Sequence, residues 1–370
     1  MYIKSLKLQN FRNYADESFA FDPAVNLICG ENGQGKTNLL EAAAACSTMR
    51  LFRTAQKKEG LRFGENHAFI FADFLAQERD ISLELRLSRT KAMEIYKNGV
   101  RQKRQSDAQG LLKTVLFCPE DLMLVRAGAA ARRRFLDTAL CQMRPNYARY
   151  LEEYNRLHEH KTRILRDSEE KPSLLSMWED FSLRMAHIGA QIIRYRAYYC
   201  RKLLKAAAAV YADIAPHEVL SGVYKTVSSV TDPFADARTI EKQLIDHVFS
   251  HKTAEIAAKS CLSGPHKDDL ELLLDGRSAA SFGSQGQVRT CTLSLKLAER
   301  ELFFDEDGEY PVLLLDDVLS ELDRRRQDFV LNRISAGQVM ITCCEDGISE
   351  KLRAGAVFHI QNGEKSAETH

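Results

Sequence analysis

A glycine-rich segment near the N-terminus constrains the fold of this 370-residue chain more than any other part of its sequence. The apolar residues Val25–Cys29 read as a β-strand, and the alanine- and leucine-rich stretch Thr37–Met49 reads as a helix. Between them the chain has the spacing G-x-x-x-x-G-K-T, which is that of a phosphate-binding P-loop. The residues expected to bind ATP through this loop are Gly30, Glu31, Asn32, Gly33, Gln34, Gly35, Lys36 and Thr37.

The residue types of the loop fit this chemistry. Glycines let backbone N–H groups approach a phosphate closely, and the positive end of the following helix favours an anion. We expect Lys36 to reach the β and γ phosphates and the Thr37 hydroxyl to ligate Mg²⁺. For the loop alone, the alternative is a glycine-rich turn between strand and helix that binds no ligand.

A second acidic site favours the nucleotide interpretation. Residues Pro311–Leu315 read as a buried parallel strand that ends in Asp316 and Asp317. A carboxylate in this place holds Mg²⁺, commonly through water, and this role is predicted for Asp316. Asp317 is expected to orient or polarise the attacking water, so Asp317 and Lys36 are the predicted catalytic residues. Two acids after a strand, taken alone, would be read as the start of a solvated loop.

Strand patterns dominate the first hundred residues. The Asn98-Gly99 dipeptide is the strongest hairpin-turn signal among them. An antiparallel section beside a P-loop strand predicts an α/β fold with a mixed β-sheet, unlike a purely parallel nucleotide fold. The expected strands cover residues 2–8, 17–21, 25–29, 68–75, 81–88, 92–97 and 115–118.

After about residue 126 the pattern becomes helical. Apolar and aromatic residues recur at three- and four-residue steps from Tyr147 to Ile164 and from Leu174 to Tyr199. This predicts an antiparallel helical hairpin with a coiled-coil-like seam, inserted in the P-loop domain. The expected lobes are 1–125 with the P-loop, 126–260 as the helical insertion, and 261–370 as the return to the head. Later expected elements are strands at 219–227, 270–274, 311–315, 339–342 and 357–361, helices at 234–257, 285–304 and 324–335, and a polar tail.

Composition sets limits on partners and location. Lys and Arg number 52 against 51 for Asp and Glu, so any nucleic-acid surface must be a local patch. The nine cysteines include no C-x-x-C pair and read as buried thiols of a reducing compartment. The N-terminal residues lack the apolar block of a signal peptide, and no run reaches the length of a membrane span. We therefore expect a cytoplasmic protein without a membrane partner.

Two further motifs resemble those of the ABC-type ATPase superfamily. Ser284–Gln287 opens a long predicted helix, and Ser320–Asp323 follows the acidic pair. They resemble the signature motif and the D-loop of that superfamily, in which the signature serine and glycine contact ATP held by the opposite subunit. The resemblance implies in-trans roles for Ser284, Gln285, Gly286, Gln287 and Asp323.

Taken together, the motifs resemble those of the RecF family of recombination mediators. They occur in that family's order and extend over nearly the whole chain. Thr342 stands where transporters place a switch histidine, which also resembles RecF, and Val288 stands where a second glutamine is expected. The segments that carry the resemblance are Asn10–Tyr14, Gly30–Ala42, Pro119–Asp121, Arg132–Asp137, Gly264–Asp269, Ser284–Gln287 and Leu314–Asp323.

The resemblance implies an ABC-type P-loop ATPase head like those of Rad50 and SMC proteins, with a short helical lobe in place of their long coiled coil. It implies ATP and Mg²⁺ as cofactors, and an ATP-dependent homodimer on double-stranded DNA near single-strand gaps and junctions. Weak ATP hydrolysis would time release. It implies partnership with RecR and, through RecR and RecO, the loading of RecA. By their position in the family motifs, Arg12 and Asn13 are expected to touch the nucleotide.

The DNA surface is predicted from basic clusters. Such clusters are individually more typical of solvated faces than of phosphate contacts. Binding through them would be independent of sequence and would weaken steeply with salt. The residues predicted to contact DNA are Lys57, Lys58, Arg101, Lys103 and Arg104.

Two other function classes stay open at this point. One is an SMC-like ATPase of the OLD type linked to nuclease action, for which His266-Lys267-Asp268-Asp269 is the candidate metal site. The other is the ATPase subunit of a transporter. The missing switch histidine and the helical hairpin between the two nucleotide motifs disfavour the transporter.

Overall fold

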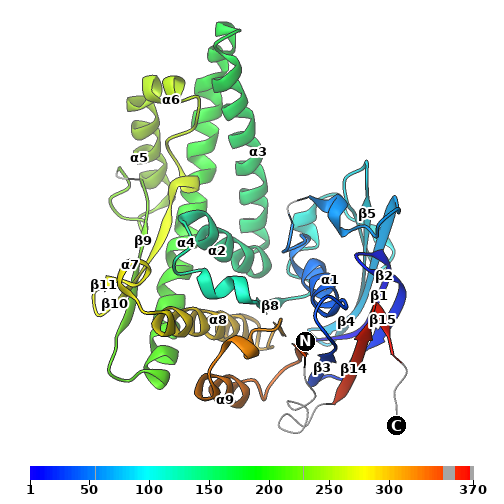
Figure 1. Cartoon of the computed structure of the whole chain (residues 1–370). Coiled ribbons are helices and arrows are strands. Elements are labelled where there is room, and N and C mark those ends of the chain that lie inside the picture. Colours follow the sequence, from blue (N-terminus) through cyan, green and yellow to red (C-terminus); the bar gives the residue numbers. More distant parts are fainter. Residues whose placement is uncertain (55, 228, 345–354, 367–370) are drawn as a thin grey trace. The chain divides into compact units, whose positions relative to one another are not determined.

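The computed structural model describes residues 1–54, 56–227, 229–344 and 355–366. The chain forms two compact units (Figure 1). The P-loop unit consists of Met1–Met123 and Thr292–His370, and the helical unit consists of Leu124–Cys291. Each unit has its own sheet or sheets and its own buried interior, and each is described by itself.

The first sheet of the P-loop unit is antiparallel and has the strand order β2-β1-β4-β5-β6-β7. Its strands alternate between buried and exposed residues because only one face packs against the interior. The predicted Asn98-Gly99 hairpin turn is confirmed, with both residues at positive φ between β6 and β7. The strands are β1 (Tyr2–Phe11), β2 (Tyr14–Ala20), β4 (His67–Ala76), β5 (Arg79–Ser88), β6 (Glu94–Lys97) and β7 (Val100–Arg101).

The second sheet contains the P-loop strand and has the order β15-β14-β3-β13-β12-β8. Strands β14, β3, β13, β12 and β8 run parallel, and β15 pairs antiparallel with β14. This sheet is mixed only through β15, because the long antiparallel strands form a sheet of their own. The strands are β3 (Val25–Cys29), β8 (Thr114–Phe117), β12 (Val312–Leu315), β13 (Val339–Cys343), β14 (Ala356–Gln361) and β15 (Glu364–Lys365).

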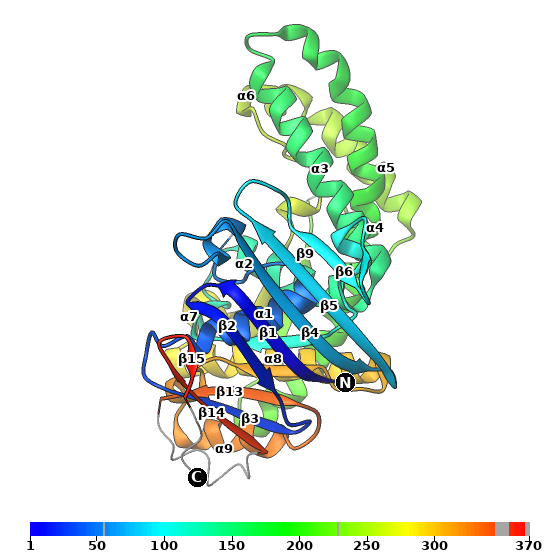
Figure 2. The same ribbon diagram turned by 90° about the vertical axis from the view of Figure 1, so that its right-hand side faces the viewer.

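Helix α1 (Lys36–Thr48) lies between the two sheets (Figure 2). Its small and aliphatic residues permit this, because Leu39 and Leu40 share one buried cluster with Ile70 of the first sheet and Met340 of the second. The run of alanines that follows is also buried, so the helix is covered nearly all round. The P-loop that precedes α1 is therefore fixed at the start of a fully packed helix.

The helical unit contains the predicted hairpin. Helix α3 (Pro145–Asp167), about 34 Å long, packs against α4 (Trp178–Ile214), with α2 (Ala129–Met143) at the base of the pair. The predicted helix at 234–257 is two helices, α5 (Ala237–Ser250) and α6 (Lys252–Ala258), because the chain turns at His251.

A small sheet and several short elements complete the chain. The sheet has the order β11-β10-β9, with β9 (Leu220–Lys225), β10 (Asp269–Leu274) and β11 (Arg277–Ser278). Helix α8 (Gln285–Asp307) begins in the helical unit and ends in the P-loop unit, which also contains α9 (Arg324–Arg333). The remaining short helices are η1 (Lys57–Gly60), η2 (Gln105–Asp107), η3 (Pro119–Met123), η4 (Pro172–Met177), η5 (Pro265–Lys267), α7 (Ala279–Phe282) and η6 (Leu319–Glu321).

The packing assigns residues 261–291 to the helical unit, whereas the motif-based division returns to the head at residue 261. The physical reason is that β10 pairs along its whole length with β9, and Arg132 of α2 forms an ion pair with Asp269. The signature segment Ser284–Gln287 accordingly belongs to the helical unit. Among the described helices, none has both the length and the apolar character needed to cross a membrane.

Candidate nucleotide site

Two glycines of the P-loop occupy positions where a side chain does not fit. Gly30 has φ 148°, and a Cβ there would lie 2.4 Å from the carbonyl oxygen of Ile360. Gly35 has φ 121°, and a Cβ there would lie 2.6 Å from Nδ2 of Asn13. The loop thus passes close to two other parts of the unit, which explains the requirement for glycine at these two positions.

Two turns, one beside Asn13 and one at Asn362-Gly363, form hydrogen bonds that hold the loop in place. Asn13 Nδ2 donates to the Gln34 carbonyl at 2.7 Å, and the Tyr14 hydroxyl donates to the Gly35 carbonyl at 3.0 Å. From the other side, the backbone N–H of Asn362 donates to Gln34 Oε1 at 2.6 Å, and that of Gly363 donates to the Gln34 carbonyl at 2.9 Å. The sequence reading treated this last stretch as a polar tail, which was wrong: Asn362-Gly363 is the turn between β14 and β15. The same dipeptide rule that found the 98–99 turn was the available signal.

Lys36 begins α1 and is almost entirely buried, with 3% of its surface exposed. Its Nζ donates to the carbonyls of Gly30, at 2.5 Å, and Glu31, at 3.2 Å. It also lies 3.3 Å from Sγ of Cys344. The ammonium group is therefore held by carbonyl groups of the loop, and its predicted contact with the β and γ phosphates stays a prediction.

The structure brings Thr37 and Asp316 together although they are 279 positions apart. Thr37 Oγ1 donates to Asp316 Oδ1 at 2.9 Å. Burial raises the pKa of the Asp316 carboxyl above its ordinary value, and the hydrogen bonds from Thr37 and Thr342 oppose that rise. The contact arises because β12 and β3 both flank β13 and run parallel, so their carboxyl ends meet at one edge of the sheet.

Thr342 holds both aspartates, a role that the sequence did not reveal. Its Oγ1 donates to Asp316 Oδ1 at 3.0 Å and accepts the backbone N–H of Asp317 at 2.7 Å. Asp317 is half-buried and has φ 48°, which is uncommon for a residue other than glycine. Strand β13 lies directly beside β12, so a hydroxyl at its end reaches the turn that follows β12.

The donor set at this edge fits Mg²⁺. That ion prefers oxygen ligands, keeps several waters, and is commonly held by one or two protein groups together with phosphate oxygens. Thr37 Oγ1 and Asp316 Oδ1 are two oxygens already within hydrogen-bonding distance, beside the loop that would hold the phosphates. The described residues contain no group of three or more His, Cys, Asp or Glu side chains arranged to hold a metal ion, so they form no metal site made of protein ligands alone.

Arg12 and Asn13 lie beside the loop, but their side chains are engaged. Arg12 forms a two-pronged ion pair with Glu41 of α1, with Nε–Oε2 at 2.8 Å and Nη2–Oε1 at 3.1 Å. The Glu41 side chain is fully buried, and burying a carboxylate requires such a partner. Asn13 accepts from Asn38 Nδ2 at 2.8 Å while donating to the loop. In this arrangement Arg12 and Asn13 support the loop and the start of α1.

The signature and D-loop residues cap helices. The backbone N–H of Ser284 donates to Gln287 Oε1 at 2.8 Å, and the N–H of Gln287 donates to Ser284 Oγ at 3.3 Å, a reciprocal capping box at the start of α8. Ser284 and Gln285 are exposed. Asp323 caps α9 by accepting the Arg326 N–H at 3.0 Å, and that bond contributes most to lowering the pKa of Asp323.

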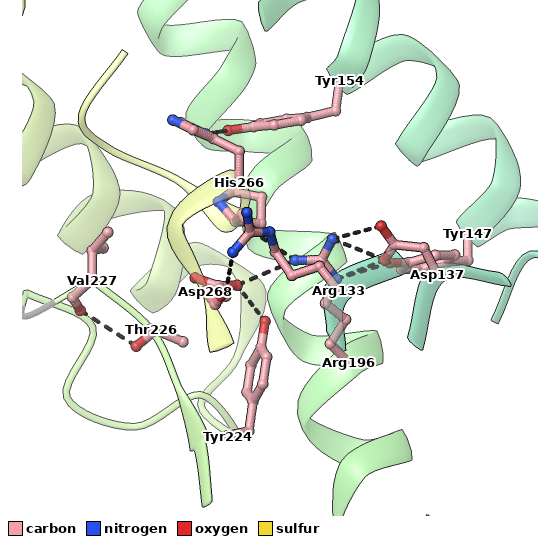
Figure 3. Close-up of polar contacts among 11 residues, drawn as sticks. Arg133, Asp137, Tyr147, Tyr154, Arg196, Tyr224, Thr226, Val227, His266 and Asp268 are labelled. Atoms are coloured by element: carbon pink, nitrogen blue, oxygen red, sulfur yellow. Dashed lines mark hydrogen bonds and ion pairs between the residues drawn. The ribbon is translucent and has the colours of Figure 1, made fainter. Parts of the chain in front are cut away.

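Residues of the candidate nuclease motif form a structural network in the helical unit (Figure 3). Asp268 is buried between the hydroxyl of Tyr224 and the guanidinium of Arg196, whose Nη1 lies 3.6 Å from Asp268 Oδ2. His266 Nδ1 lies 2.8 Å from the Tyr154 hydroxyl, and its Nε2 lies 3.0 Å from the carbonyl of Cys261. Because these groups are occupied with one another, the motif has the arrangement of a scaffold rather than of a metal site.

The predicted DNA residues do not share one environment. Arg101 forms an ion pair with Glu94 at 2.8 Å, which neutralises part of that cluster. Lys58, Lys103 and Arg104 are exposed. The backbone of Lys57 begins η1, and its side chain lies outside the described part of the structure.

Known proteins with the same organisation were found by both sequence and structure. Residues 2–366 match the family described as RecF/RecN/SMC N terminal domain. The "DNA replication and repair protein RecF" of Acetivibrio thermocellus is 33% identical over 363 residues, and that of Lactobacillus johnsonii is 37% identical over 368. In each case the alignment covers 98% of both chains.

A solved structure of the recombination mediator protein RecF with ATP in the RecFOR pathway superposes with a TM-score of 0.91 at 31% identity. The superposition covers 99% of this chain and 98% of that one. The Smc head domain of Pyrococcus furiosus, at 14% identity and a TM-score of 0.55, shares the fold. By sequence over nearly its whole length and by its ABC-type ATPase fold, the chain belongs to the RecF family.

Proposed function

We propose that this protein is an ATP-dependent DNA-binding protein of DNA replication and repair, in which ATP joins two copies of the chain on DNA. The observation that carries the proposal is the contact between Thr37 and Asp316, which brings the P-loop and the second acidic motif together from distant parts of the chain. Support also comes from relatives described as DNA replication and repair proteins and from a RecF structure described with ATP.

Within one chain, Lys36 and the loop amides bind the phosphates of ATP. On binding, the Lys36 ammonium exchanges its bonds to the Gly30 and Glu31 carbonyls for phosphate oxygens. Thr37 and Asp316 hold Mg²⁺, which neutralises charge on the β and γ phosphates when bound. Asp317, held in place through Thr342, accepts a hydrogen bond from the attacking water.

The second half of the site comes from another copy. The exposed start of α8 presents Ser284 and its neighbours to the γ-phosphate of ATP held by the opposite subunit, and Asp323 lies in the same interface. A helix start has a positive dipole end, which suits an anion, and a bound phosphate would compete with the capping bonds of Ser284 and Gln287. Loss of the γ-phosphate on hydrolysis then releases the pair, so hydrolysis acts as a timer.

Duplex DNA next to a single-strand gap is the proposed substrate, with RecR as the direct partner and, through RecR and RecO, RecA loading as the outcome. Support is the RecFOR pathway named for the related structure. The near-neutral charge of the chain, 52 basic against 51 acidic residues, means that DNA must be bound by a local surface. Nothing in the described residues favours nuclease or transporter function over this one.

Sizing by light scattering tests the proposal directly. The protein is measured without nucleotide, with ADP, and with a non-hydrolysable ATP analogue, each with and without gapped DNA. A monomer in the first two states and a dimer with the analogue are expected, with DNA bound by the dimer. A mass that does not respond to the analogue contradicts the proposal.

A further inference from the structure

A fully exposed aromatic side chain stands on the edge of the P-loop unit. Phe63 has a relative exposure of 103%, the highest value among the large apolar side chains that the structure describes. Exposure of a single apolar residue is common, but a phenylalanine with no contact surface at all gains nothing for folding. The residues around Phe63 show whether this position could serve as a binding surface.

Hydrogen bonds hold the turn that presents this ring. The N–H of Glu65 donates to the Arg62 carbonyl at 3.0 Å, and Arg62 itself is anchored by its N–H to the Asn10 carbonyl at 2.8 Å. Arg89, just beyond the end of β5, donates from Nη2 to the Glu65 carbonyl at 3.1 Å. The backbone under Phe63 is thus held by hydrogen bonds to neighbouring segments, so the turn itself needs little ordering on binding.

In the part of the chain that the structure describes, four exposed cations in or next to this turn have no carboxylate partner. Glu59 and Glu65 lie in the same segment, yet within the described residues neither forms an ion pair with them. Some exposed cations elsewhere on this unit are paired, as Arg101 is with Glu94. The four exposed cations are Lys58, Arg62, Arg89 and Lys91.

We propose that this basic turn, defined as Arg62–Asn66 with Lys58, Arg89 and Lys91, binds single-stranded DNA at a gap junction. Phe63 stacks on an unpaired base, and the cations contact flanking phosphates. The inference rests on the proposed DNA-binding function and names the surface for it. An aromatic ring beside unneutralised cations suits an unstacked nucleic acid strand, which offers both a flat base and a row of negative charge. A protein partner would need a larger apolar area than one ring supplies.

The stacking contact is tested with Phe63→Ala in the full-length protein. Because the ring is outside the core, the substitution leaves folding unchanged. Fluorescence anisotropy with the non-hydrolysable ATP analogue is measured on a gapped duplex and on a blunt duplex of the same length. We expect about a fivefold or greater loss of affinity for the gapped duplex, a smaller loss for the blunt one, and no change in salt dependence. Val219→Ala, at an exposed apolar position of the helical unit, is the control.

The phosphate contacts are tested with Arg62→Gln and Lys91→Gln. Each removed cation should lower the slope of log affinity against log salt by about 0.7 for a single-stranded contact. Arg79→Gln is the matched control, because Arg79 is also exposed and lies at the opposite end of β5. Its slope should equal that of the unmodified protein.

The outcomes separate this inference from the proposed function. If the unmodified protein binds no DNA with the ATP analogue, the proposed function fails. If it binds DNA and the Phe63, Arg62 and Lys91 variants match their controls, only the basic turn is excluded. Variants that keep DNA affinity but lose binding to RecR would also overturn the inference, because the turn would then serve a protein.

Discussion

The hydroxyl of Thr342 connects the two aspartates of the nucleotide site. It donates to the Asp316 carboxylate and accepts the N–H of Asp317, whose backbone is in the left-handed region. A hydroxyl can do both at once, whereas an aliphatic side chain can do neither. Thr342 therefore positions the two acids.

Replacing Thr342 by Val tests this role. Valine keeps the shape and leaves the Asp317 N–H without its acceptor, so the turn should relax. We expect kcat for ATP hydrolysis to fall about tenfold to a hundredfold, since small misplacements of catalytic groups have effects of this size. ATP affinity should change little, because Lys36 and the loop are untouched. Thr342→Ser restores the hydroxyl and should restore most of the rate.

Turnover and ATP affinity are measured separately for this variant. A Thr342→Val protein with unchanged kcat would exclude the positioning role. Equal losses in the Val and Ser variants would contradict a role carried by the hydroxyl, because Ser retains the hydrogen bonds and loses only the methyl group.

At the site, the sequence predicted some residues and missed others. A spacing rule relates Lys36 and Thr37 to the loop and Asp316 to a strand end, and the structure brings Thr37 and Asp316 into contact. Their roles toward ATP and Mg²⁺ stay predictions. The role of the Thr342 hydroxyl was not predicted, because its partners depend on which strand neighbours β12. Arg12 was expected to touch nucleotide and stays a prediction, with its guanidinium committed to Glu41 in this structure.

At the scale of elements, most helices and strands were predictable and their pairing was not. Two kinds of pattern predicted strands and how they are buried. Alternating residues predicted half-buried strands at 68–75 and 81–88, and a continuous apolar run predicted a buried strand at 311–315. Whether the antiparallel strands join the P-loop strand depends on contacts over hundreds of residues. They form a separate sheet because α1 fills the space between the two sheets.

The η5 segment makes the stability of the helical unit depend on pH. Burial lowers the pKa of His266 to about 3, so the folded protein keeps it neutral where the unfolded chain, with a pKa near 6.5, takes up a proton. The contribution to stability is complete above pH 6.5 and is lost as pH falls toward 3. From pH 7 to 5 the loss from this one group is about 2 kcal/mol.

The prediction is checked with His266→Gln, which removes the titrating group. Urea unfolding is followed at pH 7 and pH 5 by the fluorescence of Trp178, the only tryptophan and a buried residue of the helical unit. The unmodified protein should lose about 2 kcal/mol relative to the variant between the two pH values. Asp268, whose pKa burial raises to about 6, acts in the opposite direction in both proteins and cancels in the comparison. A difference that is the same at both pH values would contradict the prediction, and His217→Gln, at an exposed position, is the control substitution.

At the scale of the whole molecule, the P-loop and the signature segment belong to different compact units. The sequence predicted both motifs and the helical insertion, but it placed residues 261–291 with the head. Strand pairing between β9 and β10 places these residues in the helical unit instead. Pairing between such distant segments leaves no local signal in the sequence. Helix α8 is the continuous element that carries the chain from the signature segment into the P-loop unit.

Three substitutions should give three separate defects if ATP joins two copies. Lys36→Ala should lose nucleotide binding, because it removes the ammonium group that is held inside the loop. Ser284→Arg should bind ATP and stay monomeric, because a large side chain at the exposed start of α8 blocks the approach of a second copy. Asp317→Asn should form the dimer and fail to turn over.

Nucleotide binding by fluorescence and mass by light scattering distinguish these defects. The control is Ser281→Arg, another exposed serine close to the signature segment but outside it. A Ser284→Arg protein that dimerises with the ATP analogue as the unmodified protein does would remove the cross-subunit contact from the account.

The most direct test of the central claim is the rate of ATP hydrolysis per protomer as a function of protein concentration, at saturating ATP and Mg²⁺. If each active site needs residues from two copies, the rate per protomer is near zero in dilute samples. It then rises with concentration to a plateau at the concentration where scattering detects the dimer. A rate per protomer that is the same at every concentration, including those where the protein is monomeric, would contradict the account.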